Sequence, residues 1–265
     1  MHRVLGARAA DAAGFAGALR NHDRAWGSSE FELAGGHVAL WGAGMYVNRA
    51  LAVGHVQPMT AEQFDRLEAT SRAVGVAAAI EVSPATRHDV VDFATSRGYV
   101  PEGSVVVHRR GVDDIDESPS ETGFLIEPAA NRLGIWQETS ASGWGHVTQE
   151  ARRAGDAYAA VASRMDGDGF VLARDAVDGR PVGCATVTIT GAVATLGGMS
   201  TVPPERGRGV HRALIRHRLL LARGAGCEIA TTSAIPGGSS DRNLRRHGFT
   251  PWFEIQTLVL RSPSG

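Results

Sequence analysis

Hydrophobic positions in the first 110 residues alternate between a helical and a strand period. Residues 60–74 give the clearest helical pattern, because Phe64, Leu67 and Val74 recur on one face and Thr60 is a candidate N-cap. Further helices are predicted at residues 8–25 and 86–97, the second stopped by Gly98. Strand patterns occupy residues 31–54, where glycines interrupt them, then 76–82 and 104–110.

The second half of the chain predicts a longer series of elements. These are a strand at 124–128, two helices within 129–162, strands at 170–175, 182–190 and 192–202, a helix at 208–224, a strand at 227–234, a short helix at 241–247 and a strand at 252–260. Strands and helices mixed in this order predict an α/β (α+β) domain whose sheet is partly antiparallel and flanked by helices.

A break in composition separates the halves. Residues 111–123 are acidic, include Pro119 and have few apolar side chains, which is typical of a linker. A chain of 265 residues is long enough for two domains. We therefore expect an N-terminal domain at 1–112, a linker at 113–122 and a C-terminal domain at 123–265.

The two halves share a local pattern. A buried strand, a proline, a helix and an Arg-Gly-Tyr stop occur at residues 76–99, and a similar strand, proline, helix and His-Gly-Phe stop occur at 227–249. We interpret this as a diverged duplication; the alternative is a coincidence between two common strand–helix units.

Composition narrows the classes of function. The formal net charge of −1 gives no global field for nucleic acid or an anionic membrane surface. Cys184 and Cys227 are the only cysteines, too few for a disulfide framework or a structural zinc site, and no metal is expected. The N-terminus lacks the apolar core of a secretory signal, and no run approaches the roughly 18–20 apolar residues of a membrane span. The expected location is the cytoplasm.

The segment most informative about chemistry follows the strand that ends at Val202. Two prolines break the strand, and Arg-Gly-Arg-Gly-Val-His at 206–211 then opens directly into a helix. Glycines let the backbone approach a ligand, and the first turn of a helix offers free N–H groups at a positive dipole end. Such a loop suits a pyrophosphate, with Arg206 and Arg208 adding positive charge for phosphate oxygens.

Two of the three nucleotide folds that use such loops do not fit. A P-loop needs a Gly-Lys pair, and the chain contains no lysine. A dinucleotide-binding loop needs a third glycine where Arg212 stands, and its acidic residue belongs at the end of the next strand, whereas Glu228 begins that strand.

The segment resembles the coenzyme A loop of the Gcn5-related N-acetyltransferases (GNAT), Arg/Gln-x-x-Gly-x-Gly/Ala. Arg206 fits the first position and Gly209 the fourth, whereas His211 stands where the family usually has glycine or alanine. Residues 243–249, Asn-Leu-Arg-Arg-His-Gly-Phe, resemble the family's last helix and its Gly-Phe stop. The resemblance covers about residues 122–262. It implies a tandem of two GNAT-like domains, of which the N-terminal one is degenerate.

The resemblance also implies acetyl-CoA, or another acyl-CoA, as cosubstrate. The strand end Met199-Ser200-Thr201-Val202 matches the strand whose backbone holds pantetheine, and Asn243 is expected to reach the pantetheine arm. The amides expected to hold the pyrophosphate are those of Gly207, Arg208, Gly209, Val210 and His211.

The catalytic groups usual in the family are missing. Leu244 stands where many members have a tyrosine acid, and the strand at 194–199 carries no glutamate. The general acid and base are therefore unassigned. His146 is a candidate base, with a surface or helix-start histidine as the alternative. Trp136 and Trp144 are candidates for a wall of the acceptor cleft, with core packing as the alternative.

The expected function is transfer of an acetyl or short acyl group from coenzyme A to an amine of a small molecule. The alternatives are a non-catalytic acyl-CoA binder or sensor and a protein N-acetyltransferase. Neither the acceptor, the acyl chain length nor the oligomeric state follows from the sequence. One coenzyme A per chain is expected, because residues 53–60 before the first-half helix contain no Gly-x-Gly and no arginine.

Overall fold

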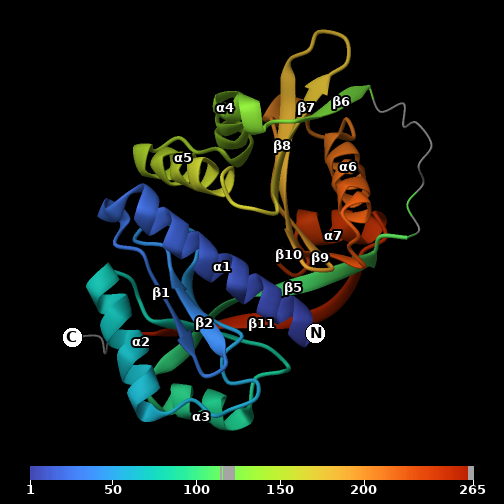
Figure 1. Ribbon diagram of the computed structural model, residues 1–265. Coiled ribbons are helices and arrows are strands. Elements are labelled where there is room, and N and C mark those ends of the chain that lie inside the picture. Colours follow the sequence, from blue (N-terminus) through green and yellow to red (C-terminus); the bar gives the residue numbers. More distant parts are fainter. Residues whose placement is uncertain (114, 116–122, 262–265) are drawn as a thin grey trace. The chain divides into compact units, whose positions relative to one another are not determined.

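The computed structural model describes residues 1–113, 115 and 123–261. These residues divide into two compact units, each with helices packed on a mixed sheet (Figure 1). Unit 1 comprises Met1–Val107, Ser233–Arg242 and Pro251–Gly265, and unit 2 comprises His108–Thr232 and Asn243–Thr250. The α/β class with a mixed sheet is confirmed. The domain limits at 112 and 123 stay a prediction, because most of the expected linker lies outside the described residues.

Unit 1 builds its sheet in the order β1-β2-β3-β4-β11-β5. Its elements are α1 (His2–His22), η1 (Arg24–Trp26), β1 (Ser29–Leu33), β2 (Gly36–Leu40), β3 (Asn48–Leu51), α2 (Ala61–Val74), β4 (Ala79–Val82), α3 (His88–Ser96), β5 (Tyr99–Gly111) as far as residue 107, and β11 (Thr250–Leu260) from residue 251. β3 and β4 are parallel, and α2 connects them.

Local signals explain α2. The Thr60 hydroxyl accepts a hydrogen bond from the Gln63 amide and the Gln63 side chain accepts one from the Thr60 amide, which is a capping box. The helix ends at Gly75, in the left-handed conformation with φ of 80°. The predicted core positions Phe64 and Leu67 are fully buried. The prediction of a helix at 60–74 is therefore confirmed.

β11 lies beside β4 although it is far from it along the chain. The pairing is antiparallel and runs from Gln256↔Val82 to Val259↔Ala79. Leu258 accordingly joins the buried cluster of unit 1 together with Ile80 and Tyr99. The chain's C-terminal strand thus completes the sheet of its N-terminal unit.

Unit 2 has the element order predicted for the second half, with strands arranged β6-β7-β8-β9-β10. Its elements are β6 (Phe124–Pro128), η2 (Ala130–Arg132), α4 (Leu133–Trp144), α5 (Gln149–Ala162), β7 (Asp168–Asp175), β8 (Pro181–Thr190), β9 (Val193–Thr201), η3 (Pro203–Glu205), α6 (Val210–Gly224), β10 (Ile229–Ala234) up to residue 232 and α7 (Ser239–Arg246) from residue 243. β9 and β10 are parallel, and the neighbouring pairs are antiparallel.

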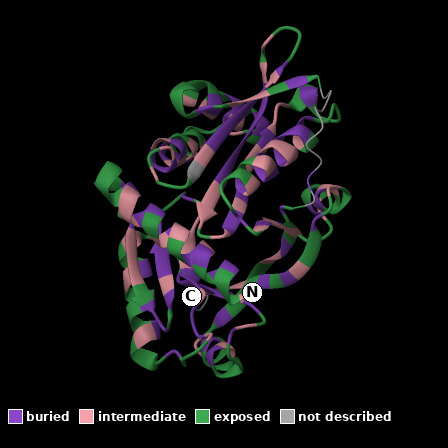
Figure 2. Ribbon diagram, turned by 45° about the vertical axis from the view of Figure 1, so that its right-hand side comes forward, coloured by how far each residue is buried: buried purple, intermediate pink, exposed green. Residues whose placement is uncertain are grey.

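The helices of unit 2 cover both faces of its strands. α4 and α5 lie on one side of β7–β9, and α6 lies on the other (Figure 1). On the α6 side, Val210 and Leu214 pack against Val171 and Ala185. Buried residues accordingly concentrate along β8 (Figure 2). No helix in the described part of the chain is both long and apolar enough to cross a membrane.

Candidate functional site

The loop between β9 and α6 presents bare backbone. Gly207 and Gly209 adopt positive φ values of 82° and 93°, and a Cβ added at either would meet nothing within 4 Å. Gly209 is the N-cap of α6 and accepts the first helical hydrogen bond, from the Ala213 amide at 3.1 Å. The amides before Ala213 have no intrahelical acceptor. The loop therefore offers space and donors at a positive helix end.

A β-bulge distorts β9 just before this loop. Cys184 pairs with Ser200 but Thr186 pairs with Gly197, so β9 has one extra residue between them. Gly198 within the bulge has a φ of 52°, and a Cβ there would lie only 3.0 Å from Thr186 Oγ1. Glycine is therefore favoured at this position, and the bulge interrupts the ladder where the resemblance expects pantetheine.

Arg218 of α6 binds backbone carbonyl groups on both strands of the bulge. This role is not among those predicted from the sequence. Its side chain is 1% exposed, and it donates to the carbonyl oxygens of Thr186 (3.0 Å) and Gly197 (3.1 Å). It has no carboxylate partner among the described residues, and burial lowers the pKa of its guanidinium to about 9. A sequence signal existed, since Arg218 lies four residues after the buried Leu214 on the apolar face of α6.

Arg206 connects the loop to α4. Its Nη2 atom donates to the carbonyl oxygen of Gly143 at 2.9 Å. Gly143 allows α4 to approach β9, because a Cβ there would lie 2.5 Å from the Ser200 Oγ atom. Ser200 is itself buried, with Oγ 3.4 Å from Cys184 Sγ, whereas Met199, Thr201 and Val202 are half-buried.

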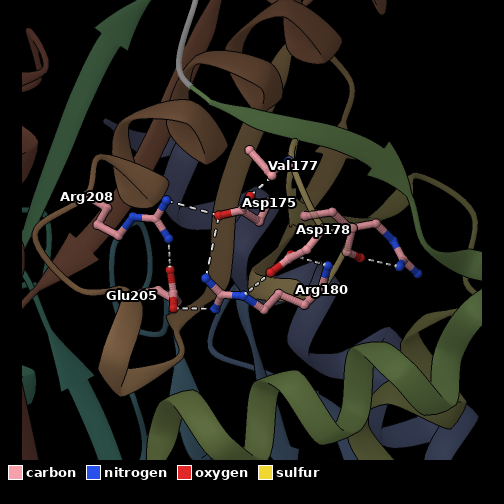
Figure 3. A network of polar contacts seen from close by, with 8 residues as sticks. Asp175, Val177, Asp178, Arg180, Glu205 and Arg208 are labelled. Atoms are coloured by element: carbon pink, nitrogen blue, oxygen red, sulfur yellow. Dashed lines mark hydrogen bonds and ion pairs between the residues drawn. The ribbon is translucent and has the colours of Figure 1, made fainter.

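Arg208 is bound by carboxylates (Figure 3). Its guanidinium donates to Asp175 Oδ2 at 3.0 Å and to Glu205 Oε2, and Arg180 donates to Glu205 Oε1. The amide of Val177 and the Arg208 guanidinium lower the pKa of Asp175, and the guanidinium groups of Arg180 and Arg208 lower that of Glu205. These carboxylates join the β7–β8 turn to the loop.

Residues 132–249 match the family described as "Acetyltransferase (GNAT) family". The match includes the bulge, the glycine loop, α6 and the Gly-Phe stop. Unit 2 therefore contains a GNAT-family domain, within residues 132–249.

Solved structures with the GNAT fold match much more of the chain. A GCN5-related N-acetyltransferase from Kribbella flavida aligns over 98% of this chain and 96% of its own, with a TM-score of 0.66 and 18% identity. A tandem GNAT protein from the clavulanic acid biosynthesis pathway aligns over 86% and 79%, with a TM-score of 0.63 and 15% identity. No curated protein matches the sequence significantly. At these identities the likeness shows the fold.

His211, at the position of the usual GNAT glycine or alanine, is half-buried. Its ring stacks on that of His247 with centroids 6.2 Å apart. Burial, followed by the charges of Arg218 and His247, lowers the pKa of His211 to about 4, which keeps the ring neutral at pH 7. The neighbouring Val210 side chain is buried in the core, so only the backbone of Val210 can contact a ligand. Asn243 is half-buried.

The three candidate residues for the GNAT acceptor side differ in their exposure to solvent. Trp136 is 2% exposed, donates its indole N–H to the Ala185 carbonyl oxygen at 3.2 Å and packs edge-on against Phe170, so the core-packing alternative describes it. Trp144, at the end of α4, is 57% exposed. His146 follows it and is half-buried, and its catalytic role stays a prediction.

In unit 1, residues 53–60 correspond to the glycine loop, and Gly54 in this segment packs against α3. The carbonyl oxygen of Gly54 accepts a hydrogen bond from the Arg87 amide at 2.9 Å. A Cβ at Gly54 would lie 2.8 Å from a methyl group of Val90 in α3. Gly54 is therefore covered by the start of α3, and its amide already donates to the Ala34 carbonyl oxygen at 3.1 Å.

Proposed function

We propose that unit 2 binds an acyl-CoA and transfers its acetyl or short acyl group to an amine of a small molecule. The observation that carries the proposal is the open backbone at Gly207 and Gly209, which leads into the N-terminus of α6 within the stretch that matches the GNAT family. The loop amides would bind the pyrophosphate, with Arg206 nearby. The bulge at Gly198 would expose strand backbone to pantetheine, and Asn243 would contact its arm.

The chemistry requires two proton movements. The amine must attack the thioester carbonyl carbon in its neutral form, and the departing coenzyme A thiolate takes up a proton. Leu244 is buried and has no proton to give at the family's tyrosine position. We infer that the thiolate is protonated by water and that His146 accepts the proton from the amine.

Release of free coenzyme A tests the proposal. The full-length protein is incubated with acetyl-CoA and a panel of small amines, and the free thiol is measured over time. Thiol release that depends on one class of amine is the expected result. A Gly209→Glu variant, whose side chain would fill the loop, is the control and should release none.

The second candidate, a non-catalytic acyl-CoA binder, is favoured by one observation, the apolar Leu244 at the usual acid position. Binding of acetyl-CoA without thiol release from any amine or peptide would support it. Release with peptide amines alone would instead support a protein N-acetyltransferase.

A further inference from the structure

Two arginines and two buried carboxylates form a closed ring beside the glycine loop (Figure 3). Arg208 contacts Asp175 and Glu205, and Arg180 contacts the same two carboxylates, at 3.6 Å from Asp175 Oδ2. The four residues are called the arginine–carboxylate ring below. Asp175 and Arg180 belong to the β7–β8 turn, whereas Glu205 and Arg208 flank the start of the loop.

The ring neutralises the charge of Arg208. The carboxylate side chains are only 5% exposed, and buried carboxylates need their partners because their own hydration is lost. Moving the Arg208 guanidinium toward a phosphate would leave Asp175 and Glu205 with one cation between them. Arg206 differs, since it is exposed and has only the neutral Gly143 carbonyl as partner within the described part of the chain.

The loop needs an anchor of this kind. Gly207 and Gly209 flank Arg208, both have positive φ, and no neighbouring atom restrains either at the Cβ position. Glycine backbone has many accessible conformations and loses much entropy when it is fixed. Arg208 supplies the restraint, because its guanidinium also lies 5.5 Å from the centre of the Phe124 ring on β6.

We propose that Arg208 is a positioning residue, which fixes the glycine loop to the β7–β8 turn through the arginine–carboxylate ring, rather than a ligand of the cofactor phosphates. The inference rests on the proposed binding of acyl-CoA and changes the role expected of Arg208 from the sequence. Phosphate binding then falls to the loop amides and Arg206, preorganised by the ring.

The two roles predict opposite effects for Asp175→Asn. Asparagine keeps the Oδ1 atom that accepts the Val177 amide hydrogen bond, so the turn is preserved. If Arg208 binds phosphate directly, the substitution frees its charge and acetyl-CoA binds as tightly as before or more tightly. If Arg208 positions the loop, affinity falls, by about fivefold to twentyfold for a lost charge-assisted hydrogen bond.

Calorimetric titration of the full-length protein with acetyl-CoA distinguishes these outcomes. Asp175→Asn, Arg208→Gln and the double variant should all lose affinity to a similar extent, because they break one ring. Glu150→Gln is the control: it also removes one negative charge, but Glu150 is exposed on α5 and contacts no residue of the ring. Its affinity should equal that of the wild type.

Hydrogen exchange of the unliganded protein measures how strongly the ring restrains the loop in the absence of the cofactor. Amides at residues 205–209 should exchange faster in Asp175→Asn and Arg208→Gln than in the wild type or Glu150→Gln. Tighter acetyl-CoA binding by Asp175→Asn, or unchanged exchange of the loop, would overturn the positioning role while leaving the proposed function intact. A wild-type protein that binds no acetyl-CoA would overturn the proposed function and, with it, this role of the ring.

Discussion

Arg218 donates a hydrogen bond from Nη1 to the carbonyl oxygen of Gly197, 3.1 Å away, at the start of the bulge in β9. The same atom donates to Thr186, so one buried cation satisfies acceptors on both strands that the bulge separates. A buried polar group without a partner costs about 1–3 kcal/mol.

Arg218→Met should therefore lower the free energy of unfolding by about 2–4 kcal/mol, even though methionine removes the cost of burying a charge. Denaturant unfolding monitored by circular dichroism measures this value. Arg212→Met, on the exposed face of the same helix, is the control and should stay within about 0.5 kcal/mol of the wild type. Equal stability of the two variants would show that the bulge does not depend on Arg218.

Gly209→Glu should abolish acetyl-CoA binding. The residue has a φ of 93°, which disfavours any side chain, and a carboxylate there would occupy the place expected for the pyrophosphate. Gly191→Glu is the matched control, because Gly191 also has positive φ and open space but lies in the β8–β9 turn. Calorimetry on both variants, with circular dichroism to check folding, provides the measurement; undiminished affinity in Gly209→Glu would refute the loop assignment.

Titration of the full-length protein should saturate at one acetyl-CoA per chain. In unit 1 the Gly54 amide already donates to the Ala34 carbonyl oxygen and Val90 covers the Gly54 Cα, so Gly54 offers no free donor to a second pyrophosphate. The Gly209→Glu variant gives a sharper test, since it should bind no acetyl-CoA at all. One equivalent bound by that variant would place a cofactor site elsewhere in the chain.

Acid should destabilise the protein partly through the arginine–carboxylate ring. The folded-state pKa values of Asp175 and Glu205 lie below their usual range, so their stabilising effect is complete at neutral pH and is lost as pH falls through those values. The melting temperature should fall as pH drops from about 5 toward 3, and less steeply in Asp175→Asn. Glu150→Gln, on the exposed surface of α5, should keep the wild-type slope; a matching slope in Asp175→Asn would contradict the linkage.

Local signals made much of the fold predictable. Thr60 and Gly75 mark both ends of α2, and the strand at 124–128 coincides with β6. The prediction of the first helix at 8–25 is wrong at both ends, since α1 spans His2–His22. Its end is explained by Asp23, which caps a separate turn by accepting the Ala25 amide hydrogen bond. The glycine loop was recognisable because its spacing is local.

Pairings between distant segments were not predictable in the same way. Asp175 and Arg208 meet only because the β7–β8 turn and the loop lie at the same end of adjacent strands, and nothing in either segment specifies the other. Arg208 therefore looked like a free cation in the sequence. Arg218 was hidden for a related reason, since its acceptors are backbone carbonyls and carry no residue signature.

The pairing of β11 with β4 has a consequence for synthesis. As the nascent chain leaves the ribosome, residues 79–82 emerge long before residues 256–259, with which they form a ladder. Until then β4 has a bare edge, an arrangement that invites pairing with other chains. Translation of the second half must therefore finish before the first half can complete its sheet. Unit 1, which is synthesised first, thus completes its folding only after the last strand has been made.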